Sequence, residues 1–164
     1  MRVRGGTGFA RRNEPAVARV LVIDDDRSTG AAIQIMLARQ GCDTVFVADA
    51  HAGVRAFELS EFDLVMVDIF MPGMNGLETI AGFRQRAPKV PIVAMSGFRF
   101  RESMGPGLDY LGMAANLGAT CLRKPFVPRQ LMAAINSGLG SAFSRDGSGG
   151  NQEPEQESTQ GSTL

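Results

Sequence analysis

Short apolar segments alternate with segments of helical spacing along most of this chain, and this alternation restricts its fold more than any other feature. The first apolar run, Val20 to Ile23, is continuous and rich in β-branched residues, which is typical of a parallel strand buried on both faces. Four further runs of this kind predict strands at 44–47, 64–67, 92–95 and 119–123. Apolar residues at helical spacing predict helices at 28–40, 50–60, 76–86, 108–117 and 128–139.

Successive strand–helix units predict an α/β fold. Strands that alternate with helices pair in parallel, and right-handed crossovers place the helices on both faces of the sheet. We therefore expect a doubly wound sheet between two helical layers. Ligands of such sheets bind beyond the carboxyl ends of the strands, so the residues that end each strand are the candidates for chemistry.

The composition changes at both ends of the 164-residue chain. The first 18 residues are rich in glycine and arginine without periodicity, and the last segment contains mainly serine, glycine, glutamine and glutamate. Segments with so few apolar residues cannot bury enough surface to fold. We therefore expect one domain at 19–140, flanked by disordered tails at 1–18 and 141–164.

Charge and hydropathy argue against several classes of protein. The 17 basic and 17 acidic residues cancel, so the net charge does not favour nucleic acid or an anionic membrane as a partner. No apolar run approaches the roughly 20 residues needed to cross a bilayer, and the start of the chain lacks the apolar stretch of a signal peptide. We expect a cytoplasmic protein without a DNA-binding output domain.

Acidic residues end two of the predicted strands. Asp24, Asp25 and Asp26 follow the first strand, and Asp68 ends the third. At one edge of a sheet these carboxylates would repel one another, so they require a cation or raised pKa values. The candidate ligands are oxygens without a histidine or thiolate, which suits Mg²⁺. A solvated loop or a cap for the following helix is the alternative for the three consecutive aspartates.

Asp68, Ser96 and Lys124 complete the chemistry expected at this edge. A carboxylate such as that of Asp68 can accept a phosphoryl group and form an aspartyl phosphate. The Ser96 hydroxyl and the Lys124 ammonium, which follow the fourth and fifth strands, would hold the phosphate oxygens. The pattern therefore predicts metal-dependent phosphorylation of Asp68.

Four segments of the chain resemble the receiver domain of bacterial two-component response regulators, the CheY-like family. They are VLVIDDD at 20–26, FDLVMVDIFMPGMNGLE at 62–78, VPIVAMSG at 90–97 and LGATCLRKPF at 117–126. The resemblance covers roughly residues 19–139. It implies a flavodoxin-like (βα)5 fold, in which a five-stranded parallel sheet of strand order 2-1-3-4-5 is covered by five helices.

The resemblance also assigns roles to individual residues. Asp68 would be the phosphoacceptor, Ser96 the signalling hydroxyl and Lys124 the phosphate-binding lysine. The implied Mg²⁺ ligands are Asp24, Asp25, Asp68 and the backbone carbonyl of Phe70. In this family the peptide bond that corresponds to Lys124–Pro125 is typically cis.

Several features leave alternatives open or depart from the family. Because three aspartates are consecutive, Asp25 and Asp26 remain an alternative metal-binding pair. Cys121 stands where the family carries an aromatic switch residue, so the usual coupling of a hydroxyl shift to an aromatic rotamer cannot operate in that form. Both Cys42 and Cys121 are expected to be free thiols in or next to the core. The connection at 97–118 is longer than usual, either as a loop before an ordinary helix or as an altered partner surface or lid.

The sequence therefore predicts a phosphorylation-dependent switch rather than an enzyme that acts on other substrates. A histidine kinase or a histidine phosphotransfer protein would supply the phosphoryl group. The output would be the binding of a downstream protein by the face formed by the fourth helix, the fifth strand and the fifth helix, relay of the phosphoryl group to a histidine phosphotransfer protein, or removal of phosphate from a kinase. A homodimer is compatible with that face. One alternative is a pseudo-receiver scaffold that is not phosphorylated. A metal-dependent phosphatase is disfavoured, because Phe70 stands where a D-x-D pattern requires its second acid.

Overall fold

The computed structural model describes residues 17–97 and 109–140. The tails that the composition predicts to be disordered lie almost wholly outside these residues, and so do residues 98–108 of the long connection. The predicted limits of the domain therefore stay a prediction. Within the described part of the chain, no helix is long and apolar enough to cross a membrane.

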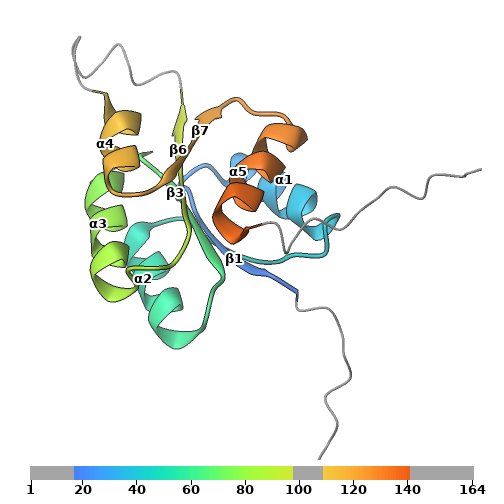
Figure 1. Cartoon of the computed structure of the whole chain (residues 1–164), viewed down its shortest axis with the longest axis horizontal. Helices are drawn as coiled ribbons and strands as arrows, with labels where there is room; N and C mark the ends of the chain where they lie inside the picture. Colours follow the sequence, from blue (N-terminus) through green and yellow to red (C-terminus); the bar gives the residue numbers. More distant parts are fainter. Residues whose placement is uncertain (1–16, 98–108, 141–164) are drawn as a thin grey trace, which may run out of the picture.

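Five parallel strands form the central sheet (Figure 1). In chain order they are β1 (Arg19–Ile23), β2 (Asp43–Val47), β3 (Leu64–Asp68), β6 (Ile92–Gly97) and β7 (Thr120–Lys124). In space the order is β2-β1-β3-β6-β7, which confirms the predicted doubly wound topology. Every residue of β3 is buried, because this strand lies at the centre of the sheet and helices cover both of its faces.

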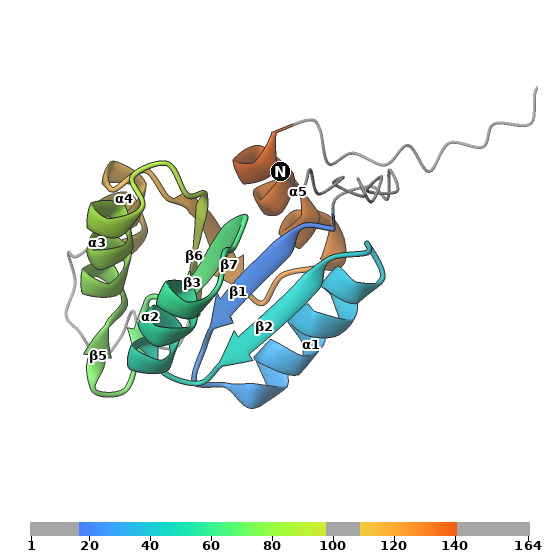
Figure 2. The same cartoon turned by 90° about the horizontal axis from the view of Figure 1, so that it is seen from below.

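Helices α1 and α5 cover one face of the sheet, and α2, α3 and α4 cover the other (Figure 1, Figure 2). Their bounds are α1 Arg27–Ala38, α2 Ala50–Leu59, α3 Gly76–Arg86, α4 Tyr110–Asn116 and α5 Pro128–Leu139. Four of these helices follow an Asp or Asn whose side chain accepts a backbone N–H of the first turn; these residues are Asp26, Asp49, Asn75 and Asp109. Such caps satisfy N–H groups that have no partner within the helix.

Alternate residues of the central strands point into two separate layers of core. In β1, Val20 and Val22 pack in the layer of α1 and α5, whereas Leu21 and Ile23 pack in the layer of α2 and α3. All four side chains are completely buried. The strand is thus apolar on both faces, and its first acidic residue, Asp24, comes only where it leaves the sheet.

The sequence does not predict the short hairpin that follows β3. Strands β4 (Phe70–Met71) and β5 (Met74–Asn75) pair antiparallel around a turn in which Gly73 has a φ of 74°. Gly76 begins α3 directly after the hairpin, and a Cβ atom there would lie 2.5 Å from the carbonyl oxygen of Asp68. A larger residue at this position would therefore displace the end of β3.

Candidate functional site

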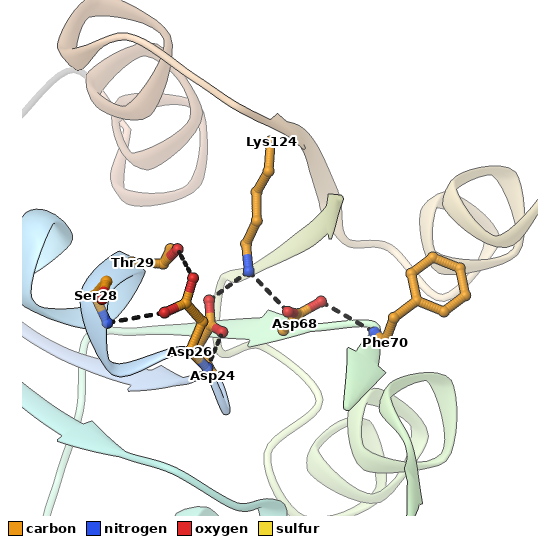
Figure 3. Close-up of polar contacts among 7 residues, drawn as sticks. All are labelled: Asp24, Asp26, Ser28, Thr29, Asp68, Phe70 and Lys124. Carbon is orange, nitrogen blue, oxygen red and sulfur yellow. Dashed lines mark hydrogen bonds and ion pairs between the residues drawn. The ribbon is translucent and has the colours of Figure 1, made fainter. Parts of the chain in front are cut away.

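Asp68 lies at the end of β3 and is only 6% exposed. One carboxylate oxygen, Oδ1, accepts a hydrogen bond from the backbone N–H of Phe70 at 3.0 Å. The other, Oδ2, accepts one from Nζ of Lys124 at 2.7 Å (Figure 3). Both oxygens are therefore held in place at the edge where the parallel strands end, which is the ligand-binding edge of such a sheet.

Lys124, at the end of β7, joins the ends of two other strands. Its Nζ atom also contacts Oδ2 of Asp24 at 2.5 Å, so the ammonium bridges Asp24, which follows β1, and Asp68, which ends β3. The side chain of Asp24 is completely buried. The Lys124–Pro125 peptide bond is cis, as the family resemblance implies. Hydrogen bonds between such charged groups are short and strong.

Asp24, Asp25 and Asp68 form a cluster of carboxylates at this edge. One oxygen from each lies within 4.8 Å of the others, and Asp25 is exposed whereas the other two are buried. With all three ionised, the single ammonium of Lys124 leaves a local charge of about −2. All the donors are oxygens, so both the donor set and the charge fit a divalent ion such as Mg²⁺.

Asp26 has a different role from the two aspartates before it. Its carboxylate accepts hydrogen bonds from the Ser28 backbone N–H at 2.9 Å and from the Thr29 hydroxyl at 2.8 Å (Figure 3). These bonds, that of Thr29 foremost, lower the pKa of Asp26. Asp26 therefore caps α1, whereas Asp24 and Asp25 are the two of the three consecutive aspartates that lie in the carboxylate cluster with Asp68.

Burial and neighbouring charges act in opposite directions on the central ion pair. Burial raises the pKa of the Asp68 carboxyl, and the nearby Lys124 ammonium offsets this only in part. For Lys124, burial alone would lower the pKa, but the charge of Asp68 and the hydrogen bonds to Asp24 and Asp68 outweigh it and raise the pKa. Lys124 therefore stays a cation, and any further cation in the cluster would favour the ionised form of Asp68.

Ser96 and Phe70 are the other two predicted site residues. Ser96 lies in β6, the strand next to β3, and is half-buried. Among the described residues its side chain forms no hydrogen bond with Asp68 or Lys124. Phe70 donates its backbone N–H to Asp68. The phosphate-binding role of Ser96 and the metal-binding role of the Phe70 carbonyl stay predictions.

Both cysteines are free thiols, but only Cys42 is buried. Cys121 is exposed, because β7 is an edge strand and borders a hollow between α4 and α5. Its Sγ atom donates to the carbonyl oxygen of Leu111 in α4 at 3.2 Å. Both are therefore the expected free thiols, but Cys121 lies at the surface beside Leu111, which packs against the core, rather than inside the core.

Two contacts of α4 with other elements, one beside the cluster and one at the opposite end of the sheet, have no signal in the sequence. The ring of Phe70 packs edge to face against that of Tyr110, with centroids 4.9 Å apart and planes at 72°. Arg84 of α3 donates to the carbonyl oxygens of Leu117 and Gly118, each at 2.8 Å. Both contacts join segments that are distant along the chain, and the acceptors of Arg84 are backbone groups that every residue carries.

Comparison with known proteins places this arrangement in a family. The family model described as the response regulator receiver domain matches residues 20–136. The DNA-binding response regulator MtrA of Mycolicibacterium paratuberculosis is 32% identical over 122 residues, which are 74% of this chain and 51% of MtrA. The alkaline phosphatase synthesis transcriptional regulatory protein PhoP of Bacillus subtilis is 28% identical over 120 residues, which are 73% of this chain and 47% of PhoP. The chain spans about half the length of these relatives.

Solved structures of receiver domains have the same fold. A CheY-like receiver domain protein from Methanospirillum hungatei is similar with a TM-score of 0.67 and 26% identity, over 76% of this chain and 94% of that one. For a receiver domain protein from Clostridium thermocellum the TM-score is 0.65 and the identity 25%, over 75% and 94% of the two chains. Together with the sheet order and the family match, these similarities show that the chain belongs to the receiver domain family of two-component response regulators.

Proposed function

We propose that Asp68 accepts a phosphoryl group from the phosphohistidine of a histidine kinase or a histidine phosphotransfer protein, and that the phosphorylated domain signals by a conformational change. The observation that carries this proposal is the buried contact between Asp68 and Lys124 inside the acidic cluster. A nucleophilic carboxylate, a fixed cation and oxygen ligands for a divalent ion lie within reach of a single phosphoryl group. A purely structural ion pair of Lys124 with Asp24 and Asp68 would not require the further carboxylate of Asp25 beside it. Its presence favours a site for phosphorylation and a metal ion over a structural role.

In the proposed transfer, an oxygen of the Asp68 carboxylate forms a bond to phosphorus while the bond from phosphorus to the histidine nitrogen breaks. The electron pair of that bond stays with the imidazole, which takes up a proton. Lys124, already at 2.7 Å from Asp68, balances the charge of the phosphate oxygens, and Ser96 donates its hydroxyl hydrogen to one of them. Water later attacks the phosphorus, releases inorganic phosphate and restores the carboxylate.

The ligands for Mg²⁺ in this proposal are Asp24, Asp25, Asp68 and the backbone carbonyl of Phe70. When bound, the ion supplies positive charge next to the phosphate oxygens. The protein residues hold the carboxylate and the phosphate in place. The domain promotes only its own phosphorylation and dephosphorylation, so we propose no enzymatic activity on other substrates.

The output surface that we propose is the face of α4, β7 and α5. A hollow of about 730 Å³ lies between these elements, and Leu111, Cys121 and Ala134 are among the residues that line it. A side chain of a partner protein fits such a depression. MtrA is a DNA-binding protein by name, but this chain matches only about half of its length. We therefore propose protein contact, and not DNA binding, as the output of residues 19–140.

Phosphorylation by a small-molecule phosphodonor in the presence of Mg²⁺ tests the proposal. We expect intact-mass measurement to show a gain of one phosphoryl group in the wild type, and none in Asp68→Asn or after removal of Mg²⁺ by a chelator. Asp43→Asn is the matched control, because Asp43 is an exposed carboxylate at the opposite end of the sheet. A wild type that gains no phosphoryl group would support the pseudo-receiver scaffold instead, and a gain retained in Asp68→Asn would place the acceptor on another residue.

A further inference from the structure

Two aromatic residues connect the candidate phosphoacceptor to α4. The backbone N–H of Phe70 donates to Oδ1 of Asp68 at 3.0 Å, and the ring of the same residue packs edge to face on Tyr110. Tyr110 is the first residue of α4, directly after the capping residue Asp109. A displacement of the Phe70 backbone at the site would therefore reach the first turn of α4 through a direct ring contact.

The other end of α4 is fastened by Arg84. Its guanidinium donates to the carbonyl oxygens of Leu117, the C-terminal capping residue of α4, and of Gly118, which follows. It also donates to the carbonyl oxygen of Val90, before β6. A cation that binds the last carbonyl groups of a helix is stabilising, both through charge-assisted hydrogen bonds and through the helix dipole. The C-terminal end of α4 is therefore the fixed end, and a movement of the helix would be largest at Tyr110.

Phosphorylation would change the bond at the start of this connection. Without phosphorylation the Phe70 N–H donates to the free carboxyl group of Asp68, and when that group is ionised the hydrogen bond is roughly twice as strong as one between neutral groups. In an aspartyl phosphate the carboxyl group is an uncharged acyl group, whichever of its two oxygens carries the phosphorus. The contact that holds Phe70 at the end of β3 would be weakened in either case.

We propose that Phe70 and Tyr110 are a pair of positioning residues that couple the state of Asp68 to the N-terminal end of α4, which turns about the end held by Arg84. This inference rests on the proposed phosphorylation of Asp68. The coupling is reciprocal, because two linked equilibria affect each other by the same factor. The arrangement of Phe70 and Tyr110 that suits the ionised carboxylate therefore opposes the phosphorylated state, and loss of the Tyr110 ring favours it.

Tyrosine fluorescence gives a direct test, because Tyr110 is the only tyrosine and the chain has no tryptophan. The full chain is phosphorylated with a small-molecule donor and Mg²⁺, and intact mass gives the phosphorylated fraction. We expect the emission of Tyr110 to change in proportion to that fraction. When both variants are phosphorylated to the same fraction, the emission of Tyr110 is expected to stay unchanged in Phe70→Leu. It is expected to change as in the wild type in the control Phe46→Leu, because Phe46 is a half-buried phenylalanine of β2, an edge strand far from α4.

The outcomes of this test are separable. A phosphorylated wild type with unchanged emission would overturn the coupling while leaving the proposed function intact, and so would a Phe70→Leu variant that keeps the full change. A wild type that is not phosphorylated, seen by mass, would overturn the proposed function and the coupling with it.

A second measurement does not depend on phosphorylation of a Phe70 variant. Beryllofluoride, a phosphoryl analogue, is titrated with Mg²⁺ and its bound form is followed by fluorine NMR. We expect Tyr110→Leu to bind it more tightly than the wild type, by roughly two- to thirtyfold, and Tyr110→Phe, which keeps the ring, to bind like the wild type. Thermal unfolding of each variant separates this effect from a loss of stability. Unchanged affinity in Tyr110→Leu, or an equal change in Tyr110→Phe, would refute the coupling.

Discussion

The two ends of the same sheet each carry a cation that pairs with a carboxylate of another strand, but the two pairs lie in different surroundings. At the carboxyl end, the side chain of Lys124 is 15% exposed and contacts both Asp24 and Asp68. At the amino end, the side chain of Arg19 is 39% exposed, and its Nε lies 3.1 Å from Oδ2 of Asp43. The side chains of Arg19 and Asp43 are 39% and 59% exposed, whereas those of Lys124, Asp24 and Asp68 are largely buried. The carboxyl end therefore depends more strongly on its charges remaining balanced.

The energies that apply to the two ends differ accordingly. An exposed ion pair contributes about 0–1 kcal/mol, because water and salt screen it. Removal of one partner from a buried pair costs about 3–5 kcal/mol, since it leaves an uncompensated charge. The carboxyl end of the sheet is therefore held in a state that a new charge, such as a metal ion or a phosphoryl group, can alter. The amino end is expected to respond less to such changes, because water screens its partly exposed pair.

The largest effect is expected for Lys124→Met. This substitution leaves Asp24 and Asp68 buried without their cation, so the free energy of unfolding should fall by about 3–5 kcal/mol without Mg²⁺. Added Mg²⁺ should recover part of the loss, because the ion replaces the missing positive charge. Urea unfolding measures both effects. Lys89→Met is the control, since Lys89 is the other lysine of the chain and is exposed; equal unfolding midpoints for the two variants would contradict the comparison.

Much of the fold could be predicted, because buried strands carry a continuous apolar signal. The run from Val20 to Ile23 differs from the observed β1 only by Arg19, whose polar side chain lies at the surface. The hairpin after β3 could not be predicted, since strands of two residues have no periodicity. Gly73 and Gly76 are compatible with a turn, but they do not show that β4 and β5 pair across it.

The site could be predicted only where position along a strand determines it. Asp68 and Lys124 both end parallel strands, so they could be expected at one edge. The sequence could not show that Asp24 lies in the carboxylate cluster while Asp26 caps α1, because these roles depend on how the chain turns from β1 into α1. The approach of Tyr110 to Phe70 depends on the packing of α4, for which the sequence gives no partner.

A smaller, pH-dependent effect is expected for Asp68→Asn. Burial, offset in part by Lys124, raises the pKa of Asp68 in the folded protein. A raised pKa means that the folded state holds the proton more tightly, so its contribution to stability is complete below the unfolded pKa of about 3.9 and is lost as the pH rises through the folded pKa. Without Mg²⁺, the wild type should therefore lose stability relative to Asp68→Asn as the pH rises above about 4.

Urea unfolding of wild type and Asp68→Asn at a series of pH values, with and without Mg²⁺, measures this difference. Because Mg²⁺ favours the ionised carboxylate, the ion should stabilise the wild type more than the variant and reduce the difference at neutral pH. If the free energies of unfolding of the two proteins ran parallel over the whole pH range, burial would not raise the pKa of Asp68. The proposed electrostatic difference between the two ends of the sheet would then be wrong.

The smallest effect is expected for Arg19→Met, at the amino end. The substitution removes the pair with Asp43 and the contact of the guanidinium with the Phe62 ring, 5.0 Å from its centroid. The backbone N–H of Arg19 still donates to Asp63, so the end of β1 stays in place. Exposed pairs and exposed cation–π contacts each contribute about 1 kcal/mol or less, and the aliphatic part of methionine replaces some of the lost packing.

We therefore expect Arg19→Met to lower the free energy of unfolding by about 1 kcal/mol or less. The difference from wild type should shrink in 1 M salt, where the screening length falls to about 3 Å. Arg55→Met, at an exposed arginine of α2, is the matched control. A salt-independent loss of stability as large as that of Lys124→Met would show that exposure does not determine how much an ion pair contributes to the free energy of unfolding in this sheet. Burial of Lys124 would then not explain the larger effect expected at the carboxyl end.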